Sequence, residues 1–433
     1  MTSSDAAIGI DFGTTNTVLA TALGDDAAEL VRFPVDGRDQ FAFRSALSFY
    51  APPERPGERE IEAGPFAIDA YVADPLETRF IQSFKTFAAS ASFTETQILS
   101  RRYLFEDLLS TYLLRLRDHA GSNVARGPTA IVGRPVTFAG AAPNEALAVS
   151  RYEMAFRRLG FTDIRYAYEP VGAAFFFARR LTEDATVLVG DFGGGTSDFS
   201  IVRFSRAGGR LSATPLGRSG VGVAGDAFDY RIIDHLVSPE LGKGTDYQGM
   251  GAVLPIPNRY YSAFARWEQL AMLRASRDMR DIRGLKRTAL EPDKIARLVE
   301  VLDDNHGYSL YRSVSRLKET LSGADDAEFR FETDNFEISR PVARAEFEGW
   351  IAPELARIET AVDEALADAG LAPIGIDRVF LTGGSSLVPA VRAIFYRRFA
   401  SERIETGAEL ESIASGLALI GREPDLDRWT KSA

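Results

Sequence analysis

Two short stretches of the chain combine acidic, glycine and hydroxyl residues in the same order. They are residues 8–20, which read IGIDFGTTNTVLA, and residues 188–202, which read LVGDFGGGTSDFSIV. In both, an apolar run ends in Asp-Phe-Gly, a turn of small residues follows, and a second β-rich run begins, which is the pattern of a β-hairpin. Asp11 and Asp191 hold equivalent places in the two copies. Two similar units this far apart predict a duplicated α/β domain that forms two lobes.

The turns and their aspartates predict a site for a polyphosphate and a divalent cation. Glycine-rich turns let several backbone N–H groups point at one anion, because no side chain blocks its approach. A hard divalent cation prefers oxygen ligands and keeps waters, so Asp11, Asp191 and the following Asp198 suit a water-mediated metal site. Either turn alone is more often an ordinary β-turn, but the pair favours phosphate. The residues expected at the phosphates are Gly13, Thr14, Thr15, Asn16, Gly193, Gly194, Gly195 and Thr196.

A third glycine turn lies between a predicted strand and a predicted helix, in VFLTGGSSLVPAV at residues 379–391. Such a junction can bring a flat or anionic ligand close to the backbone at a helix N-terminus. Alone it is a common connection. Because it follows two phosphate turns, Gly383, Gly384 and Ser385 are predicted to contact a nucleoside.

The rest of the pattern predicts the elements that hold these turns. Apolar residues recur at helical spacing between residues 101 and 119, and residues 171–181 predict a buried helix. Residues 345–370 predict one long amphipathic helix. The last dozen residues are polar and predict a frayed end.

Composition narrows the classes of protein that fit. The 433 residues are 45% apolar and 26% charged, which suits a globular protein with large cores. The chain has no cysteine, which excludes disulfides and thiolate metal sites. Its net charge of −11 argues against nucleic acid or an anionic membrane as partner. No signal peptide, membrane span, Walker A sequence or catalytic histidine motif is present, so a soluble cytoplasmic protein is expected.

Three further motifs follow the order of a known family, namely YEPVGAA, GVAGDAFDYRII and RLKETLS. With the two hairpins and the third turn, they resemble the nucleotide-binding (ATPase) domain of the 70-kDa heat-shock proteins (DnaK type), in the actin-like ATPase superfamily. The resemblance covers nearly the whole chain. It implies a duplicated actin-like (ribonuclease H-like) α/β fold, in which each lobe holds a mixed five-stranded sheet flanked by helices and a nucleotide cleft lies between the lobes. Lobe I is expected at residues 1–184 and 405–433, with a small upper subdomain at about 41–124, and lobe II at residues 185–404, with one at about 231–341.

The resemblance also implies roles for single residues. ATP or ADP is expected to bind with Mg²⁺, whose waters Asp11 and Asp191 hold with Asp198 beside them. Lys85, in QSFKTF, matches the family's catalytic lysine at the γ-phosphate, and Glu169 matches its glutamate near the attacking water. Without the resemblance, their contexts favour a solvated lysine and a strand-end cap. The residues expected at the nucleoside are Lys318, Ser322, Gly383, Gly384 and Ser385.

The implied activity is a slow, Mg²⁺-dependent hydrolysis of ATP that times a change in lobe closure. Pro135, in GRPV, matches the strand-end proline that couples nucleotide state to lobe rotation in the family. A protein client or a co-chaperone is a possible partner.

The sequence departs from the family pattern in two respects. Glu319 and Leu387 stand where the family stacks adenine between two arginines, and Ser315 stands where it has a ribose-contacting glutamate. Weaker or altered base recognition is expected, since each lost stacking contact removes on the order of 1 kcal/mol. No apolar linker or peptide-binding domain is expected after GREPDLDRWTKSA, and in this respect the chain is similar to truncated bacterial DnaK-like proteins of the YegD type.

Three alternatives from the same superfamily stay open. A small-molecule kinase also has two phosphate hairpins but carries a catalytic aspartate near the hinge. An actin-like filament protein would assemble in an ATP-dependent way. A nucleotide sensor that hardly hydrolyses is kept open by Glu319 and Leu387.

Overall fold

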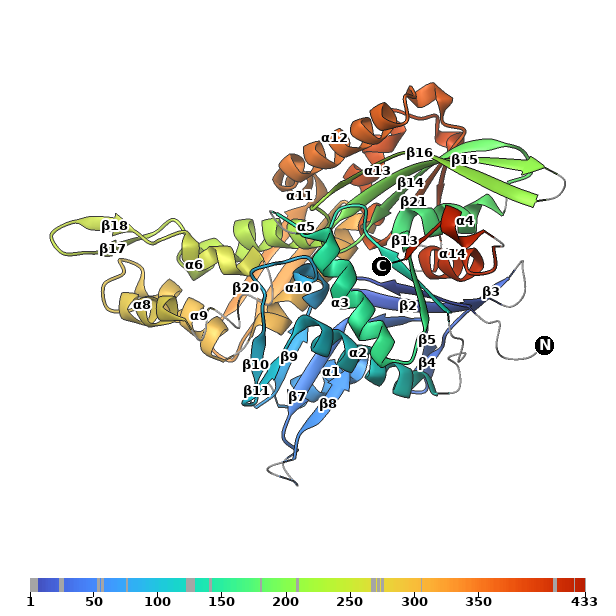
Figure 1. Cartoon of the computed structure of the whole chain (residues 1–433). Coiled ribbons are helices and arrows are strands. Elements are labelled where there is room, and N and C mark those ends of the chain that lie inside the picture. Colours follow the sequence, from blue (N-terminus) through green and yellow to red (C-terminus); the bar gives the residue numbers. More distant parts are fainter. Residues whose placement is uncertain are drawn as a thin grey trace. The chain divides into compact units, whose positions relative to one another are not determined.

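The structure is a computed structural model of the 433-residue chain (Figure 1). Two compact units are present, one of residues 1–224, 357–387 and 391–433 and one of residues 225–356 and 388–390. Each unit is described by itself, and the predicted lobe boundaries stay a prediction. The described residues are 7–432 except 23–26, 53–54, 56–57, 75–76, 122–128, 140–141, 180, 208–209, 266–269, 271–272, 274–275, 305, 408–410 and 424.

Two mixed sheets form the framework of the first unit, and their central five strands have the same order. The first sheet runs β13-β12-β1-β2-β3 and the second β22-β21-β14-β15-β16. In each, a hairpin strand pairs in parallel with one neighbour and antiparallel with the other. The predicted duplication and the two-sheet α/β fold are therefore confirmed. The strands are β1 (Ala7–Phe12), β2 (Asn16–Ala22), β3 (Ala28–Leu30), β12 (Thr129–Arg134), β13 (Asp163–Tyr168), β14 (Ala185–Phe192), β15 (Ser197–Ala207), β16 (Arg210–Val221), β21 (Arg378–Thr382) and β22 (Ile404–Thr406).

Two short strands extend the first sheet at its edges. β6 (Ala42–Arg44) pairs with β2, and β23 (Lys431–Ser432) pairs antiparallel with β13. The predicted frayed C-terminus is thus wrong, because the backbone of β23 fills the hydrogen-bonding edge of β13. A polar sequence gave no sign of this pairing, since it depends on an edge supplied by residues far away in the chain.

Helices α4 (Glu169–Ala178) and α14 (Ser412–Ile420) pack closely against each other and against the first sheet (Figure 1). A Cβ on Gly416 would lie 1.7 Å from the carbonyl oxygen of Gly172, and a Cβ on Gly9 would lie 2.2 Å from the carbonyl oxygen of Ala414. Backbone therefore meets backbone at both contacts. Glycine at these positions lets β1, which carries Asp11, and α4, which carries Glu169, both pack directly against α14.

We expect Gly416→Ala to destabilise the fold by about 1–3 kcal/mol, because the added methyl group overlaps a carbonyl that no rotamer change can move. A loss of stability would be diagnostic of this overlap, since replacing glycine with alanine inside a helix otherwise stabilises a protein by roughly 1 kcal/mol. Gly284→Ala is the matched control, because Gly284 lies in helix α8 (Arg277–Leu285) and its Cβ would meet nothing within 4 Å. Thermal unfolding checks both variants, and a Gly416→Ala variant as stable as the wild type would contradict the packing.

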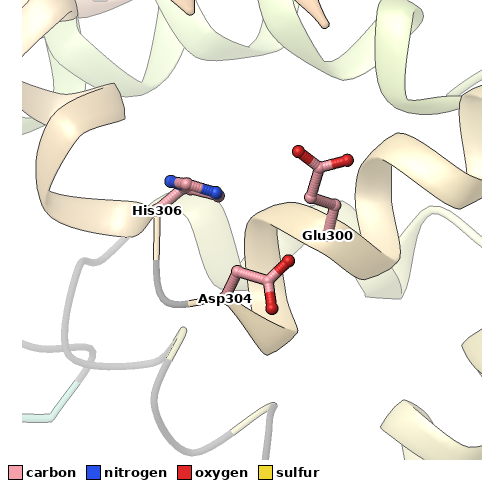
Figure 2. A group of neighbouring side chains, drawn as sticks. All are labelled: Glu300, Asp304 and His306. Atoms are coloured by element: carbon pink, nitrogen blue, oxygen red, sulfur yellow. The ribbon is translucent and has the colours of Figure 1, made fainter. Parts of the chain in front are cut away.

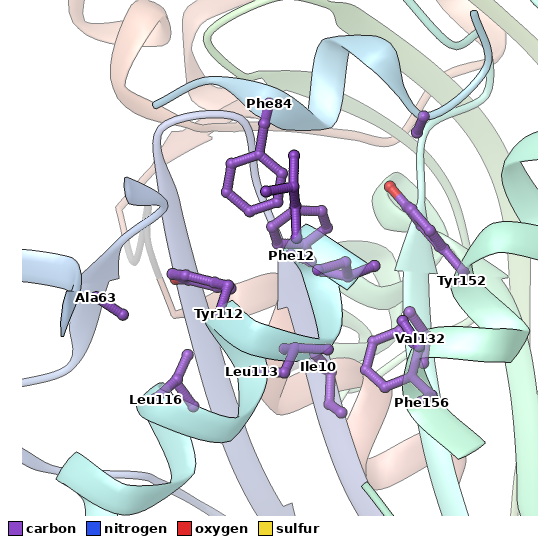
Figure 3. Packing of buried hydrophobic residues seen from close by; sticks show 14 of the residues in the cluster. Ile10, Phe12, Ala63, Phe84, Tyr112, Leu113, Leu116, Val132, Tyr152 and Phe156 are labelled. Carbon is purple, nitrogen blue, oxygen red and sulfur yellow. The ribbon is translucent and has the colours of Figure 1, made fainter. Parts of the chain in front are cut away.

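A small group of elements between β2 and β12 packs on one side of the first sheet through aromatic residues (Figure 3). Phe12 lies 5.5 Å from Phe84 and 5.9 Å from both Tyr112 and Tyr152, measured between ring centroids. The phenylalanine of the first Asp-Phe-Gly is therefore the centre of a buried cluster. The elements are β4 (Phe33–Val35), β5 (Arg38–Gln40), β7 (Ala46–Tyr50), β8 (Glu60–Ala63), α1 (Gly64–Ala73), β9 (Arg79–Gln82), η1 (Phe84–Phe87), β10 (Thr96–Ile98), β11 (Arg101–Tyr103) and α2 (Phe105–Ala120), followed after β12 by α3 (Glu145–Arg158).

The second unit is mainly helical. Helix α10 packs its apolar stripe of Leu310, Val314, Leu317 and Leu321 inward and contacts β19. Its elements are α5 (Gly225–Ile232), η3 (Ile233–Val237), η4 (Ser238–Leu241), β17 (Asp246–Gln248), β18 (Val253–Pro255), α6 (Arg259–Ser262), η5 (Ala263–Ala265), α8, α9 (Pro292–Asp303), α10 (Gly307–Gly323), β19 (Asp326–Glu332), β20 (Glu337–Ala343) and α11 (Arg344–Trp350).

The single long helix predicted at residues 345–370 is two helices. Helix α11 ends at Trp350, and α12 (Ala352–Asp368) begins two residues later, with Pro353 at its second position. Proline lacks an amide hydrogen and clashes with a preceding helical turn, so it fits the first turn of a new helix and not the interior of a long one. After α12 the chain forms η6 (Pro373–Gly375), β21, η7 (Gly384–Leu387), α13 (Pro389–Tyr396), η8 (Ser401–Arg403), β22, α14 and η9 (Leu426–Arg428).

None of the helices in the described part of the chain has the length and apolar character that crossing a bilayer requires.

Candidate functional site

The first hairpin turn, between β1 and β2, is closed by its own backbone. The amide of Gly13 donates to the carbonyl oxygen of Asn16 at 2.9 Å, and a Cβ on Gly13 would lie 2.4 Å from that oxygen. The turn therefore requires glycine at this position. Ser45 fixes the turn from outside, because its hydroxyl donates to the carbonyl of Gly13 at 2.7 Å and its amide donates to the carbonyl of Thr15 at 2.9 Å.

The second hairpin turn, between β14 and β15, has the same closure and a different support. The amide of Gly193 donates to the carbonyl oxygen of Thr196 at 3.0 Å. The hydroxyl of Ser385 donates to the carbonyl of Gly193 at 3.2 Å. Gly383 has a φ of +82°, and a Cβ there would lie 2.2 Å from the carbonyl oxygen of Phe192. The third glycine turn thus rests directly on the second hairpin.

The two hairpin turns come close to each other. A Cβ on Gly195 would lie 3.7 Å from Oγ1 of Thr14 and 4.0 Å from Cγ2 of Thr86. In the described part of the chain, the amides of Thr14, Thr15, Gly194 and Gly195 donate to no protein acceptor, whereas the first glycine of each turn uses its amide within the turn. Unused N–H donors from two neighbouring turns make a suitable cradle for an anion with several oxygens.

Lys85 is held at this place by its neighbours in the chain. Ser83 adopts a left-handed backbone with a φ of 55°, which starts η1 and turns Lys85 inward. Strained backbone of this kind persists where surrounding contacts enforce it. Phe84 provides such a contact, because it packs on Phe12 in the aromatic cluster (Figure 3). The Nζ atom of Lys85 lies 5.9 Å from the centre of the Phe12 ring.

Lys85 and Glu169 form a buried ion pair. Nζ of Lys85 donates to Oε1 of Glu169 at 2.7 Å, and the two side chains are only 9% and 7% exposed. Glu169 is the first residue of α4, where the helix dipole favours a carboxylate. Burial lowers the pKa of Lys85, but the charges of Glu169 and Asp11 outweigh it, so the net shift is upward and the lysine stays protonated.

Three aspartates lie near this ion pair. Burial raises the pKa of Asp11 to about 7, with a further contribution from Glu169, and Lys85 opposes the shift. Burial likewise raises the pKa of Asp198 to about 7 and raises that of Asp191 well above its usual range, with Glu169 and Asp11 adding to the shift of Asp191. Four carboxyl groups therefore share one lysine, and this excess of acidic groups suits a divalent cation.

Asp198 uses one of its oxygens to hold the segment after Pro135. Its Oδ1 accepts from the amides of Val136 and Thr137 at 2.8 Å and 3.1 Å. Its Oδ2 is buried and has no partner among the described residues. Such an orphaned carboxylate oxygen is costly unless a ligand or a water satisfies it. Oδ2 is therefore the oxygen of Asp198 that is available to a ligand.

Lys318 and Ser322, predicted at the nucleoside, belong to the second unit. There Nζ of Lys318 lies 2.7 Å from Oδ1 of Asp229 and donates to the carbonyl of Gly225 at 3.3 Å, and the hydroxyl of Ser322 donates to the carbonyl of Lys318 at 2.9 Å. Glu319 on the same helix is exposed. These contacts all lie within the second unit and do not join the two residues to the group around Asp11, so their nucleoside role stays a prediction.

Tyr152 lies close to Lys85, Glu169 and Asp11, and the sequence did not indicate this. Its hydroxyl is buried without a hydrogen-bond partner among the described residues. Burial raises the pKa of Tyr152, and Lys85, Glu169 and Asp11 are close enough to influence it. The only signal in the sequence was a helical apolar pattern, which identifies a core residue and not a site residue.

Comparison with known proteins agrees with this fold. A sequence model of the Hsp70 protein family matches residues 152–248 and 294–422, which is more than half of the chain. The chaperone protein DnaK of Thermus thermophilus is 25% identical over 425 residues, which cover 95% of this chain and 60% of that protein. The chaperone protein HscA homolog of Aromatoleum aromaticum is 24% identical over 462 residues, covering 98% and 60%. The chain thus spans about 60% of the length of these relatives.

The two duplicated sheets and the paired glycine turns define an actin-like ATPase fold. Within that class, the chain belongs to the Hsp70 family. Members of this family are ATPases that typically bind ATP with Mg²⁺. The family match includes the second hairpin but begins after the first hairpin and Lys85, so the geometry described above is what joins those residues to the site.

Proposed function

We propose that this chain binds ATP with Mg²⁺, hydrolyses it slowly, and acts as a chaperone-like conformational switch. The observation that carries the proposal is the buried group of four carboxyls and one lysine beside two glycine turns whose free amides lie close together. A polyphosphate with a divalent cation matches both halves of this arrangement, because it offers oxygen acceptors to the amides and positive charge to the carboxylates.

The residues that would hold the metal fit a hydrated cation. Asp11, Asp191 and the free Oδ2 of Asp198 would accept hydrogen bonds from its waters. When bound, Mg²⁺ supplies charge neutralisation at the phosphates. The predicted phosphate-binding side chains and amides of the two turns, residues 13–16 and 193–196, would fix the other phosphate oxygens.

Lys85 and Glu169 would exchange partners during the reaction. To bind a phosphate oxygen, the ammonium group of Lys85 has to leave Glu169, to which it now donates at 2.7 Å. The freed Glu169 carboxylate can then accept a hydrogen bond from the attacking water and orient it. Positioning of this kind, with electrostatic stabilisation, is most of what phosphoryl transfer asks of a protein.

The switch would pass through Asp198. Its carboxylate joins the second hairpin to the backbone after Pro135, at the end of β12 in the other sheet. A change at Oδ2 alters the charge that holds those two amides, so the state of the site is transmitted to the junction between the sheets. We assign the coupling role of Pro135 to this contact.

A non-hydrolysing nucleotide sensor is the second candidate. Leu387 favours it, because this residue is 43% exposed in η7, next to the glycine turn that is predicted to contact the nucleoside. Leucine and Glu319 cannot provide the stacking that two arginines give in the family pattern. The lobe boundaries, the nucleoside contacts of Lys318 and Ser322, and a protein client or co-chaperone belong to the proposal as well.

Calorimetric titration with ATP, in the presence of Mg²⁺, tests the proposal. We expect one ATP to bind per chain and binding to weaken after Mg²⁺ is removed. We also expect a similar affinity for ADP, because many of the contacts are with phosphates that ATP and ADP share. GTP is the control for base recognition. We expect the affinities for ATP and GTP to differ less than they would in a site that stacks adenine between two arginines. Gly195→Val is the matched variant that should block binding, since its side chain fills the space near Thr14 and Thr86. No heat with either ATP or ADP would remove the nucleotide function.

A further inference from the structure

Three potential metal ligands meet at the junction of helices α9 and α10 in the second unit. They are Glu300, Asp304 and His306, and their ligand atoms all lie within 4.8 Å of one another (Figure 2). Glu300 lies in the last turn of α9, and Asp304 is the residue that directly follows this helix, four positions after Glu300. The amide of His306 donates to the carbonyl of Val301 at 3.1 Å, which folds the chain back over that turn.

The three side chains have no other partner in the described part of the chain. Among the described residues, no hydrogen bond or ion pair engages the carboxylates of Glu300 and Asp304 or the imidazole ring of His306. The Oε1 atom of Glu300 is moreover buried and unsatisfied. A buried carboxylate oxygen without a donor is costly, and a second carboxylate nearby adds repulsion. A cation shared by the three groups removes both penalties.

We propose that Glu300, Asp304 and His306 form a binding site for a divalent transition-metal cation of the zinc type. An imidazole nitrogen with two carboxylate oxygens is a donor set of this class, whereas Mg²⁺ and Ca²⁺ favour oxygen ligands alone. Ligand atoms about 2.1 Å from a tetrahedral ion are about 3.4 Å apart, so small side-chain rotations bring the three onto one ion. Asp304 is exposed, which gives the ion a path from solvent and leaves a position for water.

The ion ties the end of α9 to the start of α10. Helix α10 begins directly after His306, whose carbonyl accepts from the amide of Leu310 at 3.0 Å. The site is distinct from the group around Asp11, since none of its ligands belongs to the first unit. The proposal is therefore independent of nucleotide binding.

Titration of the full chain with Zn²⁺, monitored by calorimetry in excess Mg²⁺, tests the site. The excess Mg²⁺ fills sites made of oxygen ligands alone, such as the aspartates of the first unit. We expect one Zn²⁺ per chain, with affinity about tenfold or more weaker in His306→Ala and in Glu300→Gln. The second variant keeps the size of the side chain, so its folding is not at risk. Zn²⁺ should also raise the unfolding temperature of the wild type by more than that of either variant.

His235→Ala is the matched control, because the His235 ring stacks on Trp350 at 5.0 Å and takes no part in the cluster. We expect this variant to bind Zn²⁺ as the wild type does. The proposal is overturned if the wild type binds no Zn²⁺, if His306→Ala binds it equally well, if His235→Ala loses as much affinity as His306→Ala, or if excess Mg²⁺ abolishes binding.

Discussion

Replacing Lys85 with alanine should lower the rate of phosphate release at saturating ATP by about 100-fold or more, which is the usual cost of removing one group that stabilises charge in a transition state. Among the described residues, Lys85 is the one cation that forms an ion pair with any of the four clustered carboxyl side chains, through Glu169. Its ammonium group stays protonated there. Binding of ADP should change much less, because the amides of the two turns remain. Release of phosphate and calorimetric binding of ADP are the two measurements.

The Lys85 variant needs two controls because the ion pair is buried. Removing one partner leaves Glu169 as an uncompensated charge, which costs roughly 3–5 kcal/mol in other proteins. Lys85→Met keeps the length of the side chain, and its unfolding temperature shows whether the fold is intact. Lys294→Ala is the matched control for a lost lysine ion pair, since Lys294 pairs with Glu291 in the second unit, at 3.0 Å. Equal phosphate release from Lys85→Ala and the wild type would remove Lys85 from the mechanism. Phosphate release by the wild type at a normal, Mg²⁺-dependent rate would exclude the sensor alternative.

The duplicated hairpins could be predicted because their determinants are local. Alternating β-rich residues, an Asp-Phe-Gly end and a glycine turn specify each hairpin within about fifteen residues. The same closure, from the first glycine amide to the carbonyl three residues on, occurs in both turns. The break between α11 and α12 was equally local, since Pro353 marks it, and was overlooked in favour of the longer apolar period.

The contacts inside the site could not be predicted, because they join residues far apart in the chain. The ion pair of Lys85 and Glu169 spans 84 positions. The bonds from Val136 and Thr137 to Asp198 span about sixty, and they turn an expected metal residue into a link between two sheets. No periodicity or turn signal carries such information. The family resemblance identified the candidate residues, and only the folded structure shows which residues they contact.

Without Mg²⁺, the free energy of unfolding should fall as the pH rises from about 4 towards 7, and the aspartates of the site should cause this fall. The pKa of Asp11 and that of Asp198 are about 7 in the folded chain, above their ordinary value of 3.8. Between these two values the folded state keeps protons that the unfolded state has released, so each rise in pH favours unfolding. Above pH 7 both states have lost these protons, and the contribution becomes constant.

The contribution of Asp198 is isolated by comparing the wild type with Asp198→Asn in chemical denaturation at pH 5 and pH 8, with EDTA. Asparagine keeps an oxygen for the amides of Val136 and Thr137, so the fold should persist. We expect the variant to gain on the order of 2 kcal/mol over the wild type between pH 5 and pH 8, since a full three-unit pKa difference sets an upper bound of about 4 kcal/mol. Asp39→Asn, which changes an aspartate whose side chain is 53% exposed, should show no such gain.

Mg²⁺ should reverse the effect more fully in the wild type than in Asp198→Asn. A cation near Asp11, Asp191 and Asp198 favours their ionised forms, so it lowers their pKa values and restores stability at pH 8. Asp198→Asn has one fewer carboxylate to respond, so its stability should depend less on Mg²⁺. Parallel pH profiles for the two proteins, with and without the cation, would show that the orphaned oxygen of Asp198 is satisfied by something other than a metal-bound water.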